Sequence, residues 1–136
     1  MGRKFSRETA MKLLYQMQIQ QDDKEEQLKR MLEKYPFSHK EKAYIEDVVK
    51  GVLVNKDKID NLIEQKAIGW KLNRISKVDL SILRLGIYEI MFRDDIPYTV
   101  TINEAVEMAK KYSTEEAGAF INGIFSKIPK GTGMIE

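Results

Sequence analysis

The sequence predicts an all-α fold, a compact bundle of about seven helices that forms a single domain over residues 1–136. Three observations predict it. Apolar residues recur at the spacing of an amphipathic helix in seven segments, no segment shows a strand pattern of any strength, and three segments begin with a capping-box pattern. A chain of 136 residues also has enough mass for one domain with its own core.

The first three predicted helices cover the N-terminal part of the chain. The first is expected over about residues 6–20 and the second over about residues 24–35, where Pro36 follows it. The third begins at Ser38-His39-Lys40-Glu41, where a serine and a glutamate stand at the spacing of a capping box. Each segment carries one apolar stripe and therefore has one face to bury.

Four more helices are predicted in the remainder of the chain. They are expected after Asn55, over residues 76–92, from Thr101 onward, and over residues 113–128 until Pro129. The last segment contains Asn122-Gly123, which signals a hairpin only between alternating strands. Because the helical stripe continues through this pair, it is predicted to be helical.

The fifth segment, residues 76–92, is apolar almost all round and is therefore predicted to lie in the middle of the bundle. Four polar residues interrupt it, and buried polar groups must be hydrogen-bonded or cost stability. Arg84, Tyr88 and Glu89 are expected to tie this helix to its neighbours. Asp79, near the helix start, suits both the helix dipole and contact with a partner.

Composition argues against several kinds of site. The chain has no cysteine and one histidine, so neither a disulfide nor a metal site is expected, and no cofactor is predicted. There is no glycine-rich phosphate loop, and no catalytic triad can be assembled around His39. Asp79 and Glu89 lie about 15 Å apart along one helix, too far for a catalytic pair. Catalysis is not predicted.

The expected location is the cytoplasm. No signal-peptide pattern opens the chain, since charged residues recur through residue 12, and no run approaches the roughly 18 apolar residues of a membrane helix. The net charge of +2, from 23 basic and 21 acidic residues, says little about partners.

The distribution of charge is more informative, because Arg3, Lys4, Arg7 and Lys12 form a local basic excess. By composition alone a solvated terminus is the favoured interpretation. The alternative is a mobile basic arm that becomes ordered on single-stranded RNA, with Phe5 either stacked on a base or docked on the bundle.

Several short motifs, in order along the whole chain, resemble the NusB family of bacterial transcription antitermination factors, which also act in ribosomal RNA synthesis. The motifs are Arg7-Glu8-Thr9-Ala10 with Leu14-Tyr15; Trp70 with Arg74, Asp79, Ile82-Leu83-Arg84 and Tyr88-Glu89; Pro97 with Ile102-Asn103-Glu104-Ala105-Val106-Glu107 and Ala109-Lys110; and Phe120-Ile121-Asn122-Gly123-Ile124.

The resemblance implies seven helices in two packed helical subdomains. It also implies a non-enzymatic factor that binds single-stranded boxA RNA jointly with NusE, a small-subunit ribosomal protein, and acts with other Nus factors and RNA polymerase indirectly. The implied RNA-binding residues are Arg3, Lys4, Arg7 and Phe120. The implied NusE-binding residues are Tyr15, Asp79, Tyr112 and Glu116. Trp70 is expected to be a packing anchor between the two halves.

One departure and three alternatives accompany this resemblance. The basic cluster before the first helix is sparser than in many relatives, which predicts weaker RNA binding and a shallower salt dependence. A NusB-like domain also forms the N-terminal module of some ribosomal RNA cytosine methyltransferases, an interpretation that needs a longer chain. A purely protein-binding helical scaffold is another alternative. An exposed partner face is also compatible with a homodimer, which the sequence does not predict.

Overall fold

The computed structural model describes residues 2–130, and this part of the chain contains only helices, turns and loops. It confirms the predicted all-α bundle of about seven helices. The predicted domain of residues 1–136 reaches beyond the described residues at both ends. The elements in order are α1 (Arg3–Ile19), α2 (Lys24–Lys34), α3 (His39–Val54), α4 (Lys56–Lys66), the 3-10 turn η1 (Leu72–Arg74), α5 (Lys77–Phe92), α6 (Tyr98–Tyr112) and α7 (Glu115–Phe125).

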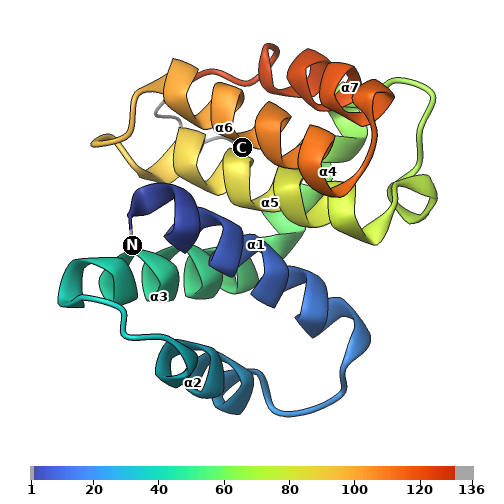
Figure 1. Cartoon of the computed structure of the whole chain (residues 1–136). Helices are drawn as coiled ribbons and strands as arrows, with labels where there is room; N and C mark the ends of the chain where they lie inside the picture. Colours follow the sequence, from blue (N-terminus) through green and yellow to red (C-terminus); the bar gives the residue numbers. More distant parts are fainter. Residues whose placement is uncertain (1, 131–136) are drawn as a thin grey trace.

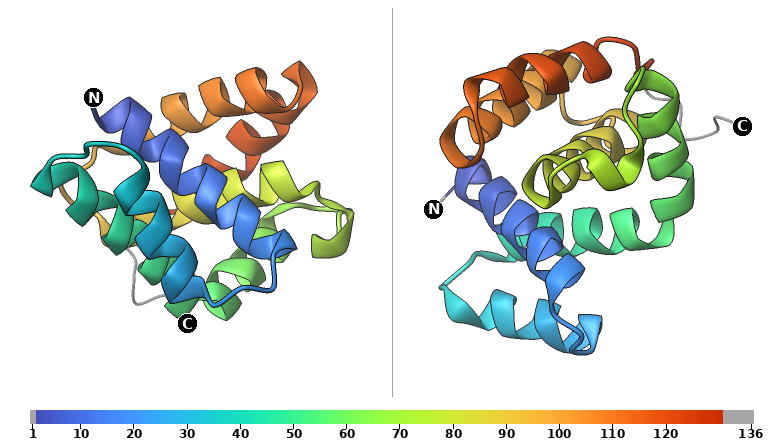
Figure 2. Two further views of the ribbon diagram at one scale, coloured as in Figure 1. Left: turned by 60° about the horizontal axis from the view of Figure 1, so that its bottom comes forward. Right: turned by 90° about the vertical axis from the view of Figure 1, so that its right-hand side faces the viewer.

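Helix α5 is central, as its apolar run predicts. Every residue from Leu80 to Met91 is buried, and α1, α3, α4, α6 and α7 all pack against this helix. In Figure 1, α6 and α7 lie on one side of α5, and α1, α2 and α3 lie on the other. The two further views in Figure 2 show the same grouping. The predicted two groups of helices are present, and α5 contributes to the core of both.

The polar residues of α5 hold it to the surrounding helices. The Arg84 guanidinium makes two hydrogen bonds to the Asp60 carboxylate on α4, at 2.8 and 2.9 Å. The Tyr88 hydroxyl donates to Asp47 on α3 at 2.9 Å. The prediction that Arg84 and Tyr88 are internal ties is confirmed.

Two glycines allow neighbouring helices to approach α5 closely. A Cβ atom at Gly51 would lie 2.1 Å from the Tyr88 ring, and one at Gly86 would lie 2.4 Å from the Phe125 ring. These distances are well inside van der Waals contact, so a larger residue would displace the ring. Gly51 therefore sets the packing of α3 on α5, and Gly86 sets the packing of α7 on α5.

Several helix starts follow their local sequence. Ser38 and Glu41 form the predicted capping box of α3, and the Ser76 hydroxyl accepts from the Asp79 amide at 3.1 Å to begin α5. Helix α7 begins one residue later than its motif suggests, because Thr114 is the N-cap and accepts from the Ala117 amide. The helix continues through Asn122-Gly123, as predicted.

Two helices begin earlier than predicted. Helix α1 starts at Arg3, so the basic N-terminal residues belong to a helix; the Ser6 amide and hydroxyl both donate to the Gly2 carbonyl. The prediction of a mobile arm is therefore wrong for the described residues. Helix α6 starts at Tyr98 after Pro97, which places Thr101 one turn inside the helix rather than at its cap.

Two kinds of feature are absent from residues 2–130. No helix there is long and apolar enough to cross a membrane, and no group of three or more metal-binding side chains occurs.

Candidate functional site

Arg7, predicted to contact RNA, lies inside the protein. Its side chain is 4% exposed, and its guanidinium makes two hydrogen bonds to the Glu89 carboxylate of α5, at 2.9 and 3.2 Å. A phosphate cannot reach this guanidinium unless the buried ion pair opens. Burial and the ion pair with Glu89 therefore make Arg7 a structural residue in this structure, and its contact with RNA stays a prediction.

Two more side chains complete the bonding of Glu89, which is fully buried. The Thr101 hydroxyl of α6 donates to the Glu89 carboxylate at 2.7 Å, and the Tyr44 hydroxyl of α3 donates to its other oxygen. Burial, followed by the nearby Glu89 charge, raises the pKa of Tyr44 well above its ordinary value. Tyr44 thus keeps its proton, and one carboxylate joins four helices.

The accessible cations at the start of α1 are Lys4, which is exposed, and Arg3, which is half-buried. The Arg3 guanidinium lies 4.4 Å from the centre of the Tyr44 ring, and the Lys4 ammonium is 3.6 Å from a Glu104 carboxylate oxygen. The Lys4 side chain is 66% exposed, so this ion pair is a weak surface contact that an anion can replace.

Sequence reasoning missed Lys40 as a neighbour of this surface. Lys40 lies in the first turn of α3 and, with Arg3, lines a hollow of about 320 Å³ beside Gly2. The capping box at Ser38 located the turn, but nothing in the sequence indicated that α3 begins next to the start of α1. Arg3, Lys4 and Lys40 are called the cationic surface below.

A second group of charges surrounds Tyr112, one of the predicted NusE-binding residues. The ammonium groups of Lys12 and Lys111 lie 5.1 and 5.2 Å from the centre of its ring. The Tyr112 hydroxyl donates to Glu8 at 3.0 Å, and Lys111 bonds to the same carboxylate at 3.1 Å. These contacts fix the end of α6 against α1 and hold the aromatic ring close to two cations.

Tyr15 lies on the exposed side of α1, where 36% of the residue is accessible. Three residues later, the Gln18 amide donates to the Lys77 carbonyl at 2.8 Å and to the Ser81 hydroxyl at 2.7 Å. These two bonds place the C-terminal half of α1 against the start of α5. Tyr15 is therefore presented near the end of the molecule at which α5 begins.

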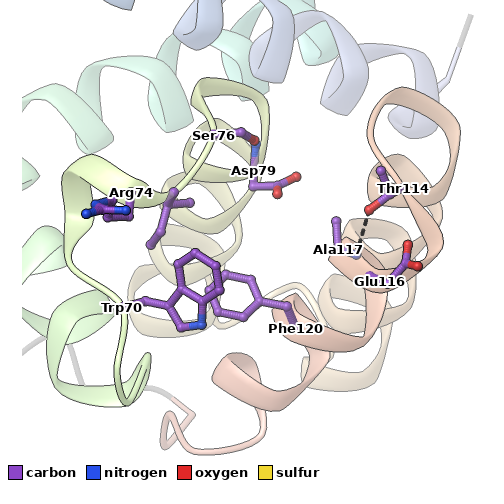
Figure 3. Close-up of a pocket in the computed structure, with 9 residues that line it drawn as sticks. Trp70, Arg74, Ser76, Asp79, Thr114, Glu116, Ala117 and Phe120 are labelled. Atoms are coloured by element: carbon purple, nitrogen blue, oxygen red, sulfur yellow. Dashed lines mark hydrogen bonds between the residues drawn. The ribbon is translucent and has the colours of Figure 1, made fainter.

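Asp79, Glu116 and Phe120 line one pocket of about 300 Å³ between the start of α5 and α7. The fourth prominent side chain in the pocket is Trp70, whose ring contacts Phe120 edge to face at a centroid distance of 5.8 Å (Figure 3). Trp70 is 50% exposed, so the prediction of a packing anchor between the halves is wrong. It is instead an accessible wall of the pocket, which will be called the aromatic pocket.

The structure separates Phe120 from the other predicted RNA-binding residues. The guanidinium groups of Arg3 and Arg93 lie over the same Tyr44 ring, so α1 begins beside the C-terminal end of α5. Asp79 and the aromatic pocket are at the N-terminal end of α5, and Asp79 is fourteen residues before Arg93 in the chain. At 1.5 Å per residue the two places are about 20 Å apart. Phe120 lies with the predicted partner-binding residues rather than with Arg3 and Lys4.

The four predicted partner-binding residues come from four different helices, which meet on one side of the molecule. Tyr15 is on α1, Asp79 on α5, Tyr112 ends α6, and Glu116 is in the first turn of α7. Figure 1 shows the starts of α5 and α7, the end of α6 and the second half of α1 at its right-hand side. The fold thus brings Tyr15, Asp79 and Glu116 to one end, while the Tyr112 hydroxyl reaches back to Glu8, one turn along α1 from Lys4.

Comparisons with known proteins identify the family of the chain. Residues 4–130 match the sequence model of the NusB family. The chain is 61% identical over 130 residues to the transcription antitermination protein NusB of Acetivibrio thermocellus, an alignment that covers 96% of this chain and 90% of that protein. The chain belongs to the NusB family. The corresponding protein of Ruminiclostridium cellulolyticum is 56% identical, with the same coverage of both chains.

Solved structures of NusB proteins share the fold. The structure of T. maritima NusB superimposes with a TM-score of 0.86 at 40% identity and covers 94% of this chain and 90% of its own. A NusB chain in a crystal structure of the antitermination factors NusB and NusE in complex with dsRNA gives a TM-score of 0.83 at 27% identity. That alignment covers 98% of this chain and 97% of the other.

Proposed function

We propose that this protein is a non-enzymatic transcription antitermination factor that binds boxA RNA together with NusE and so supports ribosomal RNA transcription. It would act in the cytoplasm and meet other Nus factors and RNA polymerase through this complex. The observation that carries the proposal is the division of its surface. Cations gather at one end of α5, and Asp79 and Glu116, two of the residues proposed for NusE, lie at the other, about 20 Å away.

The cationic surface is proposed to hold the RNA backbone. Arg3 and Lys40 come from two helices and line one hollow, and Lys4 follows Arg3 on α1, so their charges can meet phosphates. Arg7 is not included, because its guanidinium is committed to Glu89. So few cations predict weak binding of RNA alone and a shallow dependence of affinity on salt. A second contact, through NusE, would then be needed for tight binding.

The opposite end is proposed to hold NusE through Tyr15, Asp79, Tyr112 and Glu116. Two carboxylates and two tyrosines suit a basic ribosomal protein, because complementary charge speeds association and aromatic rings anchor interfaces. RNA bound at one end and NusE at the other can also touch each other, which would couple the two binding events.

The test is a titration of fluorescently labelled boxA RNA with and without NusE, with single-stranded, double-stranded and scrambled RNA compared. NusE is expected to raise the affinity for boxA RNA, and the RNA is expected to raise the affinity for NusE by the same factor. Equal RNA affinity with and without NusE would contradict joint binding. Equal affinity for boxA and scrambled RNA would contradict sequence recognition.

A matched pair of variants tests the cationic surface. The triple variant Arg3→Ala, Lys4→Ala, Lys40→Ala should weaken RNA binding and flatten its salt dependence. The control removes three exposed lysines of α2 and α3 that do not line the hollow, Lys24, Lys29 and Lys50, with the same change in net charge. It should bind RNA as the original chain does. Equal losses in both variants would mean that only overall charge matters.

A further inference from the structure

Resting on the proposed function, the geometry of the aromatic pocket points to a specific ligand, and we infer that it receives one arginine side chain of the protein partner. The pocket is defined by Trp70, Phe120, Asp79 and Glu116. Its volume of about 300 Å³ lies at the lower end of the range for ligand clefts and suits a single side chain.

The first argument is that one carboxylate oxygen of Asp79 accepts no hydrogen bond from the described residues. Oδ1 of Asp79 is shut off from solvent and has no hydrogen-bond partner among the described residues. The helix cap does not use this carboxylate, because the cap consists of the Asp79 backbone amide bonded to the Ser76 hydroxyl. A shielded carboxylate oxygen left unpaired costs free energy, and this cost would be recovered if the Asp79 carboxylate turned toward a donor in the pocket.

The second argument is the chemistry of the walls. Trp70 and Phe120 present ring surfaces, and Ile75 and Ala117 add apolar area between them. A guanidinium group stacks on aromatic faces while its edge donates to carboxylates, and its aliphatic stem packs on apolar surface. Asp79 on α5 and Glu116 on α7 offer carboxylates on two sides of the same space (Figure 3).

The third argument separates arginine from an RNA base, which could also stack on Trp70. Two carboxylates line the pocket, and phosphates of an RNA strand would be repelled by them. Arg74 is the one cation among the lining residues. Its head group points away from Asp79 in Figure 3. The local charge therefore favours a cationic ligand.

Trp70 makes the inference measurable, because it is the only tryptophan in the chain. Its fluorescence is followed while NusE is added to the intact protein, with N-acetyl-arginine amide and its uncharged citrulline analogue as competing probes. NusE is expected to change the Trp70 signal. The arginine amide should reduce NusE binding at concentrations at which the citrulline analogue has no effect, since only the guanidinium carries a charge.

The variant pair changes charge and preserves shape. Asp79→Asn with Glu116→Gln should weaken NusE binding about thirtyfold or more, as expected when a buried charge pair loses one member. The control, Asp57→Asn with Glu115→Gln, also neutralises one first-turn aspartate and one α7 glutamate, but at residues that do not line the pocket. It should bind NusE as the original chain does.

Two results would overturn the inference. One is unchanged NusE affinity in the Asp79→Asn, Glu116→Gln variant; the other is a Trp70 signal that responds to boxA RNA without NusE and not to NusE, which would assign the pocket to a base. Joint binding of RNA and NusE by the original chain is measured in parallel. If it is absent, the proposed function fails; if it is present while the variant is unaffected, only the pocket inference fails.

Discussion

At the scale of single residues, the Glu89 carboxylate is the point at which four helices meet. Its partners Arg7, Tyr44 and Thr101 are 82, 45 and 12 residues away in sequence. Sequence reasoning recognised Glu89 as an internal tie because it interrupts an apolar run. It grouped Arg7 with the exposed cations, although Arg7 shares a helical stripe with Ala10 and Leu14, which are buried. That spacing was the available signal for burial.

Removing the guanidinium should therefore damage stability more than it damages an RNA contact. Arg7→Met is expected to lower the free energy of unfolding by about 3–5 kcal/mol, because it leaves the Glu89 charge buried and unpaired. Urea unfolding measures the change. Lys4→Met, which removes an exposed ion pair, should cost under about 1 kcal/mol. Similar small losses in both variants would contradict a structural role for Arg7.

Tyr88 predicts a dependence of stability on high pH. Burial and its hydrogen bond to Asp47 raise the pKa of Tyr88 from 10.0 to about 12. The unfolded chain then loses this proton at a lower pH than the folded protein does, so the stabilisation is complete below pH 10 and falls as the pH rises toward 12.

Tyr88→Phe isolates this effect, because it removes the titrating hydroxyl and keeps the ring. The variant should be less stable than the original chain at neutral pH, and the difference should shrink between pH 10 and pH 12. Denaturant unfolding of both proteins at neutral and at high pH measures it. A difference of constant size would show that the Tyr88 hydroxyl titrates alike in the folded and unfolded chains.

At the scale of elements, periodicity predicted which segments are helical, and tertiary contacts decided some of their ends. The capping box at Ser38 was found from sequence because its two partners are three residues apart. The motif at Thr101 predicted the wrong start for α6. The Thr101 hydroxyl bonds to Glu89 across the core, and the helix begins at Tyr98, after Pro97. A local pattern cannot show that a side chain is used elsewhere.

Two helical glycines should respond in opposite ways to the same substitution. Gly86→Ala forces a Cβ atom against the Phe125 ring between α5 and α7, and overpacking of this kind costs about 1–3 kcal/mol. Nothing lies within 4 Å of the corresponding atom at Gly123, so Gly123→Ala should stabilise α7 by about 0.4–1 kcal/mol. Thermal or urea unfolding compares them. A stabilising Gly86→Ala would show that α7 does not pack tightly on α5.

At the scale of the whole molecule, the order of motifs predicted the family and the fold, but not how far apart the two surfaces lie. That separation depends on α1 running beside α5 so that Arg3 and Arg93 share the Tyr44 ring. No residue spacing in the sequence indicates that α1 lies beside α5. It also explains why Phe120 was grouped with the basic terminus, and why Lys40 was not recognised.

The sharing of α5 predicts that both groups of helices unfold together. Glu89 joins α5 to α1, α3 and α6, Arg84 joins it to α4, and Phe125 of α7 packs at Gly86. If either group separated, it would expose the apolar surface of α5, so no half of the bundle should persist alone.

Far-ultraviolet circular dichroism reports all helices, and Trp70 fluorescence reports the connection between α4 and α5. Both should follow one urea transition with one midpoint. Asp60→Ala, which removes the tie to α4, should move both midpoints by the same amount; a Trp70 transition that moves alone would show that α4 unfolds independently of the rest.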